Sequence, residues 1–145
     1  IKVLRFKHRV PKHRVVVDAD GLGWGVVSSI GAKSFKNNGS AIRVGKEIPN
    51  YKNLQTQCLY LLADKINQGE LYISADLSTD QMQYINQELA QIQSKGDHDP
   101  EKKLECKGKA QIKQDIGRSP DYRDMIFMRI FFELKKTISL VTNWS

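Results

Sequence analysis

The fold class is decided by the segment RVVVDADGLGWGVV, residues 14–27. Its first part, residues 14–18, is a compact run rich in β-branched side chains, which predicts a buried strand that ends at the acid. Residues 21–25 predict a tight turn, and residues 26–30 continue it into a short helix. A second short strand near residues 34–36 would complete a βαβ unit. The sequence therefore predicts an α/β fold.

Two amphipathic helices are expected in the middle of the chain. Apolar residues recur at spacings of three and four over residues 51–68, which predicts a helix that Gly69 ends. Ser78 or Thr79 can cap a second helix, which fades near Lys95. The other expected elements are a short basic helix over residues 1–9, short strands over 71–74 and 103–107, a turn-rich stretch before Pro120, and a loose tail over residues 136–145.

The last helix has the clearest sequence signals. Ser119 can cap it, and Pro120 suits the first helical position because its missing N–H would have no helical acceptor. Asp121 adds a negative charge at the positive end of the helix dipole. Residues 122–134 are apolar on most faces, so the helix is expected to be buried.

The chain has 145 residues and a net charge of +7. This length corresponds to one domain, and the missing initial Met leads us to expect a fragment of a longer protein. No apolar run approaches the roughly eighteen residues of a membrane span, so a soluble, intracellular protein is expected. Residues 1–14 hold six basic residues and no acid, and residues 102–118 are again rich in lysine. This surplus favours a polyanionic partner, and a solvated basic face is the alternative explanation.

The cysteines and histidines indicate no zinc site. Cys58 and Cys106 lie far apart without a CxxC spacing, and His8, His13 and His98 form no ligand pattern. Cys58 falls on the apolar face of its predicted helix, so we expect a buried, reduced thiol.

Asp18 is the first candidate for chemistry, because it ends a strand at the position where α/β folds bind ligands. The glycines that follow it allow a ligand to approach the backbone. A Rossmann-type nucleotide site is the alternative. Its fingerprint matches poorly, since the last glycine spacing is wrong and the acid precedes the glycines instead of following them by about twenty residues.

Asp121 and Asp124 are the second candidates, because a spacing of three places both on one face of the first helical turn. A purely structural role would explain them as well, because acids in the first turn interact favourably with the helix dipole. Together with Asp18 they have a functional one, since carboxylate oxygens from a strand end and a helix start could chelate a hard divalent cation.

Three blocks occur in order along the chain, and they read VVVDADGLGWGVV, NYKNLQTQCLYLLADKINQGELYI and KAQIKQDIGRSPDYRDMIFMR. Together they resemble the nuclease domain of phage terminase large subunits, over residues 3–134, and the GRSPDYRD motif is the most specific part. The resemblance implies an RNase H-like mixed sheet flanked by helices and lacking its first strands. Residues 1–145 would then be the C-terminal part of a terminase-like nuclease domain.

The resemblance also implies hydrolysis of phosphodiester bonds with two Mg²⁺ or Mn²⁺ ions. Asp18, Asp121 and Asp124 match the catalytic, metal-binding acids of the family, and Asp121 is slightly favoured over Asp124 as the direct ligand. The first metal-binding acid of the family has no counterpart in the chain. We therefore expect weak metal binding and little cleavage by this chain alone.

Lys109 and Lys113 match basic positions of the family, where they could contact DNA phosphates or neutralise the clustered acids. Arg118 is expected to bind DNA as well. The implied setting is the cytoplasm of a bacterium that carries a phage or prophage, with double-stranded DNA as substrate and an ATPase domain, a portal and a small terminase subunit as partners. The alternative is a non-catalytic basic module that binds DNA or a partner protein and whose acids are structural.

Overall fold

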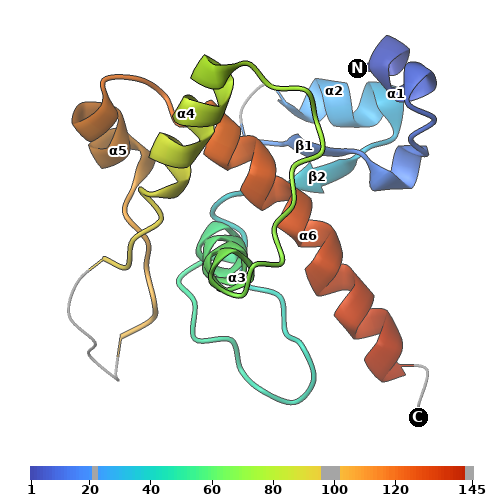
Figure 1. The fold of residues 1–145 in the computed structure, drawn as a ribbon. Helices are drawn as coiled ribbons and strands as arrows, with labels where there is room; N and C mark the ends of the chain where they lie inside the picture. Colours follow the sequence, from blue (N-terminus) through green and yellow to red (C-terminus); the bar gives the residue numbers. More distant parts are fainter. Residues whose placement is uncertain (21–22, 96–101, 143–145) are drawn as a thin grey trace.

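The structure is a computed structural model and describes residues 1–20, 23–95 and 102–142. The elements in chain order are α1 (Lys2–Lys7), the 3-10 helix η1 (Lys12–Arg14), β1 (Val16–Asp18), α2 (Gly23–Ile30), β2 (Lys33–Phe35), α3 (Leu54–Asn67), α4 (Thr79–Leu89), α5 (Lys109–Ile116) and α6 (Asp121–Thr142). Figure 1 shows α6 crossing the molecule, with α3 and α4 packed against it. None of the helices within these ranges has the length and the apolar composition that spanning a lipid bilayer requires.

The two strands run parallel, and α2 connects them as the crossover of a βαβ unit. Asp18 lies opposite Phe35 in the register. The pairing extends one residue further, since the amide of Ala19 donates to the carbonyl of Phe35 at 2.7 Å. These observations confirm the α/β class and the predicted βαβ unit. In the described part of the chain the sheet consists of these two parallel strands.

Gly23 allows α2 to begin directly behind β1. A Cβ atom at this position would lie 1.7 Å from the carbonyl oxygen of Asp18. No side chain fits so close to a backbone atom, and the return of the chain past the strand end therefore requires glycine here. Residues 21 and 22 of the predicted turn lie outside the described residues.

Phe35 joins the sheet to α6. Its side chain is fully buried, and its ring centroid lies 5.6 Å from that of Phe127 and 5.7 Å from that of Phe131. Aromatic rings at such distances in tilted or edge-to-face orientation attract each other beyond the burial of their apolar area. α3 completes this core with the buried residues Leu54, Cys58, Leu59 and Leu62. The core thus lies between the sheet, α3 and α6. The predicted burial of α6 is confirmed for one face of the helix, since Phe131 and Leu134 are buried while Met125 is 58% exposed.

The two predicted amphipathic helices are present as α3 and α4. Asn53 caps α3, because its side chain accepts a hydrogen bond from the amide of Thr56 at 2.9 Å. α4 begins with a capping box, in which Ser78 and Gln81 each accept a hydrogen bond from the other's backbone amide. Cys58 is fully buried on α3, and burial raises the pKa of its thiol to about 12. The predicted buried, reduced thiol is confirmed.

The segments over residues 71–74 and 103–107 do not form the predicted strands. Tyr72 in the first is 88% exposed, and this segment has no ladder partner within the described ranges. The second makes isolated bridges, from Leu104 to Tyr51 and from Cys106 to Ser94. A short extended run becomes a strand only when a neighbour completes its backbone hydrogen bonds, and sequence patterning does not reveal that neighbour.

Residues 23–25 begin α2 instead of forming the predicted turn, and two longer segments are also helical where the sequence predicts irregular structure. α5 replaces the turn-rich stretch, and Ile112 is its buried residue, so no periodic apolar face marks this helix in the sequence. Gly117 ends it in the left-handed conformation, with φ of 73°. α6 begins at Asp121, one residue later than predicted, and continues to Thr142, so the predicted loose tail is helical over residues 136–142. A helix already nucleated and packed extends at little cost.

Phe35→Ala should lower the free energy of unfolding by about 3–5 kcal/mol, because it leaves a cavity where three rings meet. The matched control is Phe6→Ala, at a position that is 83% exposed. We expect this control to change the free energy of unfolding by less than about 0.5 kcal/mol. Urea denaturation followed by circular dichroism measures both. Equal losses in the two variants would contradict the described core.

Candidate functional site

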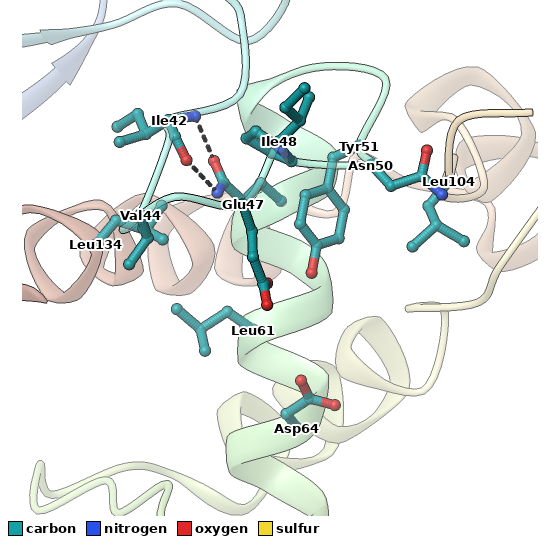
Figure 2. A pocket seen from close by; sticks show the side chains of 12 residues that line it. Ile42, Val44, Glu47, Ile48, Asn50, Tyr51, Leu61, Asp64, Leu104 and Leu134 are labelled. Atoms are coloured by element: carbon teal, nitrogen blue, oxygen red, sulfur yellow. Dashed lines mark hydrogen bonds between the residues drawn. The ribbon is translucent and has the colours of Figure 1, made fainter.

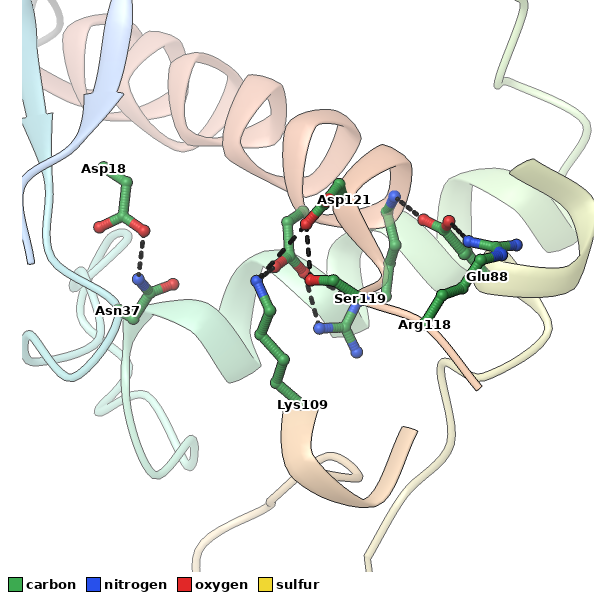
Figure 3. A network of polar contacts seen from close by, with 9 residues as sticks. Asp18, Asn37, Glu88, Lys109, Arg118, Ser119 and Asp121 are labelled. Atoms are coloured by element: carbon green, nitrogen blue, oxygen red, sulfur yellow. Dashed lines mark hydrogen bonds and ion pairs between the residues drawn. The ribbon is translucent and has the colours of Figure 1, made fainter. Parts of the chain in front are cut away.

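Asp18 ends β1 beside a second carboxylate, that of Asp20. Asn37, which follows β2, holds both: its Nδ2 donates to Oδ2 of Asp18 at 3.2 Å and to Oδ2 of Asp20 at 2.9 Å. Two backbone amides add to this arrangement, since that of Asp20 donates to Oδ1 of Asp18 at 2.9 Å and that of Asn37 to Oδ2 of Asp20 at 3.2 Å. We call Asp18 and Asp20 the strand-end pair, and Figure 3 shows Asp18 with its partner Asn37.

Asp20 and Asn37 are the residues of this arrangement that sequence reasoning missed. The signal was present in the topology: Asn37 comes two residues after β2, as Asp20 comes two residues after β1. The carboxyl ends of parallel strands meet at one edge of the sheet, so polar residues in these positions are expected to converge.

Asp121 and Asp124 lie on the first turn of α6 and share a cation, the ammonium group of Lys109 on α5. Lys109 Nζ lies 2.7 Å from Oδ2 of Asp124 and 3.8 Å from Oδ1 of Asp121. The hydroxyl of Ser119 donates to Oδ1 of Asp121 at 2.6 Å. The Asp121 side chain is 79% exposed and that of Asp124 only 18%. We call Asp121 and Asp124 the helix-start pair, and Figure 3 shows Asp121 with Lys109 and Ser119.

Asp124 is held on both of its oxygens. Besides Lys109 on Oδ2, the guanidinium group of Arg123 donates to Oδ1 from Nε at 3.1 Å and from Nη2 at 2.7 Å. The Arg123 side chain is 1% exposed and lies 6.0 Å from the ring centroid of Phe127. Two cations therefore fix the orientation of the Asp124 carboxylate, whereas Asp121 remains accessible to solvent.

Arg118 is bound within the protein. Its Nη1 donates to Oε1 of the buried Glu88 on α4, and its Nη2 donates to Oε1 of Gln87 at 2.9 Å and to the carbonyl of Tyr84 at 3.3 Å. The guanidinium carbon lies 4.3 Å from the ring centroid of Tyr84. Arg118 thus connects α4 to the segment that precedes α6.

The three residues expected to bind DNA are placed differently from one another. Lys109 neutralises the helix-start pair, which is one of the two roles that the sequence left open for it. Lys113 lies one turn later on α5 and is exposed. Arg118 makes the contacts to α4 described above. DNA binding by these residues stays a prediction.

A hollow of about 380 Å³ lies away from these acids, between the loop over residues 42–51, α3 and α6 (Figure 2). Gln57 fixes the loop, because its side chain accepts from the amide of Ile42 at 2.7 Å and donates to the carbonyl of Ile42 at 2.8 Å. Burial and, secondly, the charge of Asp64 raise the pKa of Tyr51 on its wall. No predicted site residue lines this hollow.

The two acidic pairs offer the type of ligand atom that a divalent cation requires. Carboxylate oxygens are the ligands that Mg²⁺ and Mn²⁺ prefer, and each pair already binds a nitrogen donor. Over residues 1–20, 23–95 and 102–142, however, no three Asp, Glu, His or Cys side chains form a group that could hold a metal ion. The structure thus unites Asp121 with Asp124, and Asp18 with Asp20, without collecting the three predicted ligands in one group. Metal binding by Asp18, Asp121 and Asp124 stays a prediction.

Neither a protein-family model nor a curated protein sequence matches the chain. Solved structures do match it. The nuclease domain of the large terminase subunit gp2 of bacterial virus Sf6 is 23% identical in sequence, with a TM-score of 0.66, over 88% of this chain and 68% of that domain. Mutant forms of the same domain, solved with manganese and beta-thujaplicinol or with calcium, give 22% identity and a TM-score of 0.67 over the same shares.

These similarities agree with the resemblance found in the sequence blocks. At 22–23% identity they concern the fold. The chain therefore has the α/β fold of the nuclease domain of a phage terminase large subunit.

Proposed function

We propose that the chain is part of a metal-dependent endonuclease domain that cuts concatemeric viral double-stranded DNA during genome packaging. The observation that carries this proposal is the fold shared with the Sf6 nuclease domain, together with carboxylates at the end of β1 and at the start of α6. These are the two places where the sequence motifs of terminase nucleases lead us to expect catalytic acids.

Mg²⁺ or Mn²⁺ is the proposed cofactor, with two ions in the complete site. Structures of the Sf6 domain were solved with manganese and with calcium. When bound, such ions stabilise the attacking and leaving oxygens of a phosphodiester. Asp18 and Asp121 are the proposed direct ligands. Asp121 is preferred to Asp124 because it is exposed, while Asp124 already bonds to Arg123 and Lys109.

Lys109 occupies the position where a cation would neutralise the helix-start pair. Its ammonium group lies close to both carboxylates, so a divalent ion that bound the helix-start pair would compete with it for the same oxygens. Released from the acid, Lys109 is free to contact a DNA phosphate. Lys109 would then neutralise the acids in the absence of metal and contact DNA once metal is bound, which are the two roles that the sequence left open for it.

We propose that the chain alone binds metal weakly and cuts DNA slowly, because the two acidic pairs lack a third acid within the described ranges. A further carboxylate from the same domain would complete the site. In this proposal residues 1–145 are the C-terminal part of the nuclease domain, and an ATPase domain, a portal and a small terminase subunit are its partners in the bacterial cytoplasm.

The proposal requires saturable Mn²⁺ binding that both acidic pairs support. Asp18→Asn and Asp121→Asn should each weaken it strongly, because each removes a charged ligand. If both residues hold the same ion, the double variant should bind no more weakly than either single variant. Isothermal titration with Mn²⁺ measures these affinities.

Asp80→Asn is the matched control for this titration, since Asp80 is also an acid in the first turn of a helix, α4. It should leave the Mn²⁺ affinity unchanged. Equal affinities in the Asp18, Asp121 and Asp80 variants would rule out the proposed site. Rapid, Asp18-dependent nicking of supercoiled plasmid by the chain alone would show that no further carboxylate is needed.

Lys109→Met should make the protein less stable without divalent ions, by about 1 kcal/mol at most, because the helix-start pair loses its shared cation. Mn²⁺ should then raise the melting temperature of the variant more than that of the unsubstituted chain, since the ion no longer competes with the ammonium group. Lys113→Met, one turn later on α5, is the control and should show neither effect. Thermal denaturation with and without Mn²⁺ measures these melting temperatures. If Mn²⁺ raises the melting temperature of Lys109→Met no more than that of Lys113→Met, Lys109 does not compete with the ion.

A second candidate function is a non-catalytic module that binds DNA through its basic N-terminal stretch. One observation favours it: within the described residues, none of the six basic side chains of residues 1–14 makes an ion pair. Lysines later in the chain, such as Lys52 and Lys65, are paired with glutamates. Cations that no internal carboxylate neutralises are available to phosphates.

The second candidate predicts DNA binding in the presence of EDTA that depends on the N-terminal lysines. Replacing Lys2 and Lys7 by Gln should reduce the slope of log affinity against log salt by about 0.9 for each phosphate that the protein no longer neutralises. Replacing the paired Lys52 and Lys65 by Gln changes the net charge equally and should leave the slope unchanged. Fluorescence anisotropy of a labelled duplex at several salt concentrations measures it. Identical slopes for the two double variants would exclude the N-terminal stretch as the DNA-binding surface.

A further inference from the structure

Glu88 on α4 is a fully buried carboxylate with a donor on each oxygen. Oε1 accepts a hydrogen bond from Nη1 of Arg118, and Oε2 accepts one from the backbone amide of Arg123 at 2.9 Å (Figure 3). Removing a carboxylate from water is costly unless such partners compensate for the lost hydration. The position of Glu88 is therefore determined by these two contacts.

The contact with Arg123 stabilises the start of α6. The first amides of a helix have no acceptor within the helix itself. Arg123 is the third residue of α6, and Glu88 supplies the acceptor for its amide from another helix. A negative charge at this end also interacts favourably with the helix dipole. Glu88 thus fixes α4 to the turn that carries the helix-start pair.

The side chain of the same arginine reaches the candidate metal ligands. Its guanidinium group makes two hydrogen bonds to Oδ1 of Asp124 and is 1% exposed, so it has little freedom to reorient. Arg123 therefore links the Arg118–Glu88 ion pair, through its backbone amide, to Asp124, through its guanidinium group. The ammonium group of Lys109 donates to the other oxygen of Asp124, Oδ2.

We propose that Glu88 is a positioning residue for the cation site at the helix-start pair. It touches neither the ion nor the substrate. It holds the backbone of Arg123, and through it the carboxylate of Asp124 and the first turn of α6, in the geometry that binds a divalent ion. This inference rests on the proposed function, because it concerns the same site.

The test is the Mn²⁺ affinity of folded Glu88 variants, followed by the decrease in the EPR signal of free Mn²⁺. In the double variant Glu88→Leu/Arg118→Leu, apolar side chains replace the buried ion pair, an exchange that often preserves stability. Its affinity should fall roughly 10–100-fold, as is typical when a group that orients a metal ligand is removed. The control Lys65→Leu/Glu70→Leu removes a surface ion pair and should bind like the unsubstituted chain.

Glu88→Gln provides the conservative rescue, because it retains an oxygen of the same reach for the Arg123 amide. Its affinity should lie well above that of the Glu88→Leu/Arg118→Leu variant. If the latter does not fold, Glu88→Asp replaces it, since this variant keeps the charge but is too short to reach the amide, and it should bind Mn²⁺ more weakly than Glu88→Gln.

Two results would overturn the inference, and they are distinguishable. A folded Glu88→Leu/Arg118→Leu or Glu88→Asp variant with the affinity of the unsubstituted chain refutes the positioning role alone. Absence of saturable Mn²⁺ binding by the unsubstituted chain refutes the proposed function and the positioning role together.

Discussion

The contact of Phe35 with Phe127 and Phe131 sets the position of the sheet relative to α6, and the candidate site depends on it. Phe35 is the last residue of β2 and lies opposite Asp18 in the register. The residue that anchors the sheet is therefore the immediate neighbour of the strand-end acid. Because closely packed aromatic cores do not deform continuously, the same contact limits where Asp18 can lie relative to the start of α6.

The charges around the start of α6 form one connected system. Two carboxylates at the surface share an ammonium group, and behind them a buried glutamate is paired with an arginine. Arg123 connects the two layers, with its amide on Glu88 and its guanidinium group on Asp124. Acids gathered in this way repel one another unless cations are present, so the site is suited to exchange one cation for another.

Sequence reasoning identified what depends on local pattern. The β-branched run of residues 14–18 predicted β1, and periodic apolar residues predicted α3 and α4. It did not predict elements that depend on tertiary contacts. One example is α5, which buries Ile112 but has no periodic apolar face in the sequence. Asn37 was missed because its role depends on which strand ends meet. The sequence analysis expects Arg118 to bind DNA. It did not predict the contact with Glu88, because Glu88 lies on a helix thirty residues earlier in the chain.

In the proposed function, Asp18 and the helix-start pair bind a common metal centre. Crystals grown with Mn²⁺ and measured at a wavelength where manganese scatters anomalously test it most directly. We expect an anomalous peak bonded to a carboxylate oxygen of Asp18. We also expect a bond to Asp121 or Asp124, either from the same ion or from a second ion about 4 Å away. Peaks confined to other residues, with Asp18 and the helix-start pair more than about 10 Å apart, would contradict it.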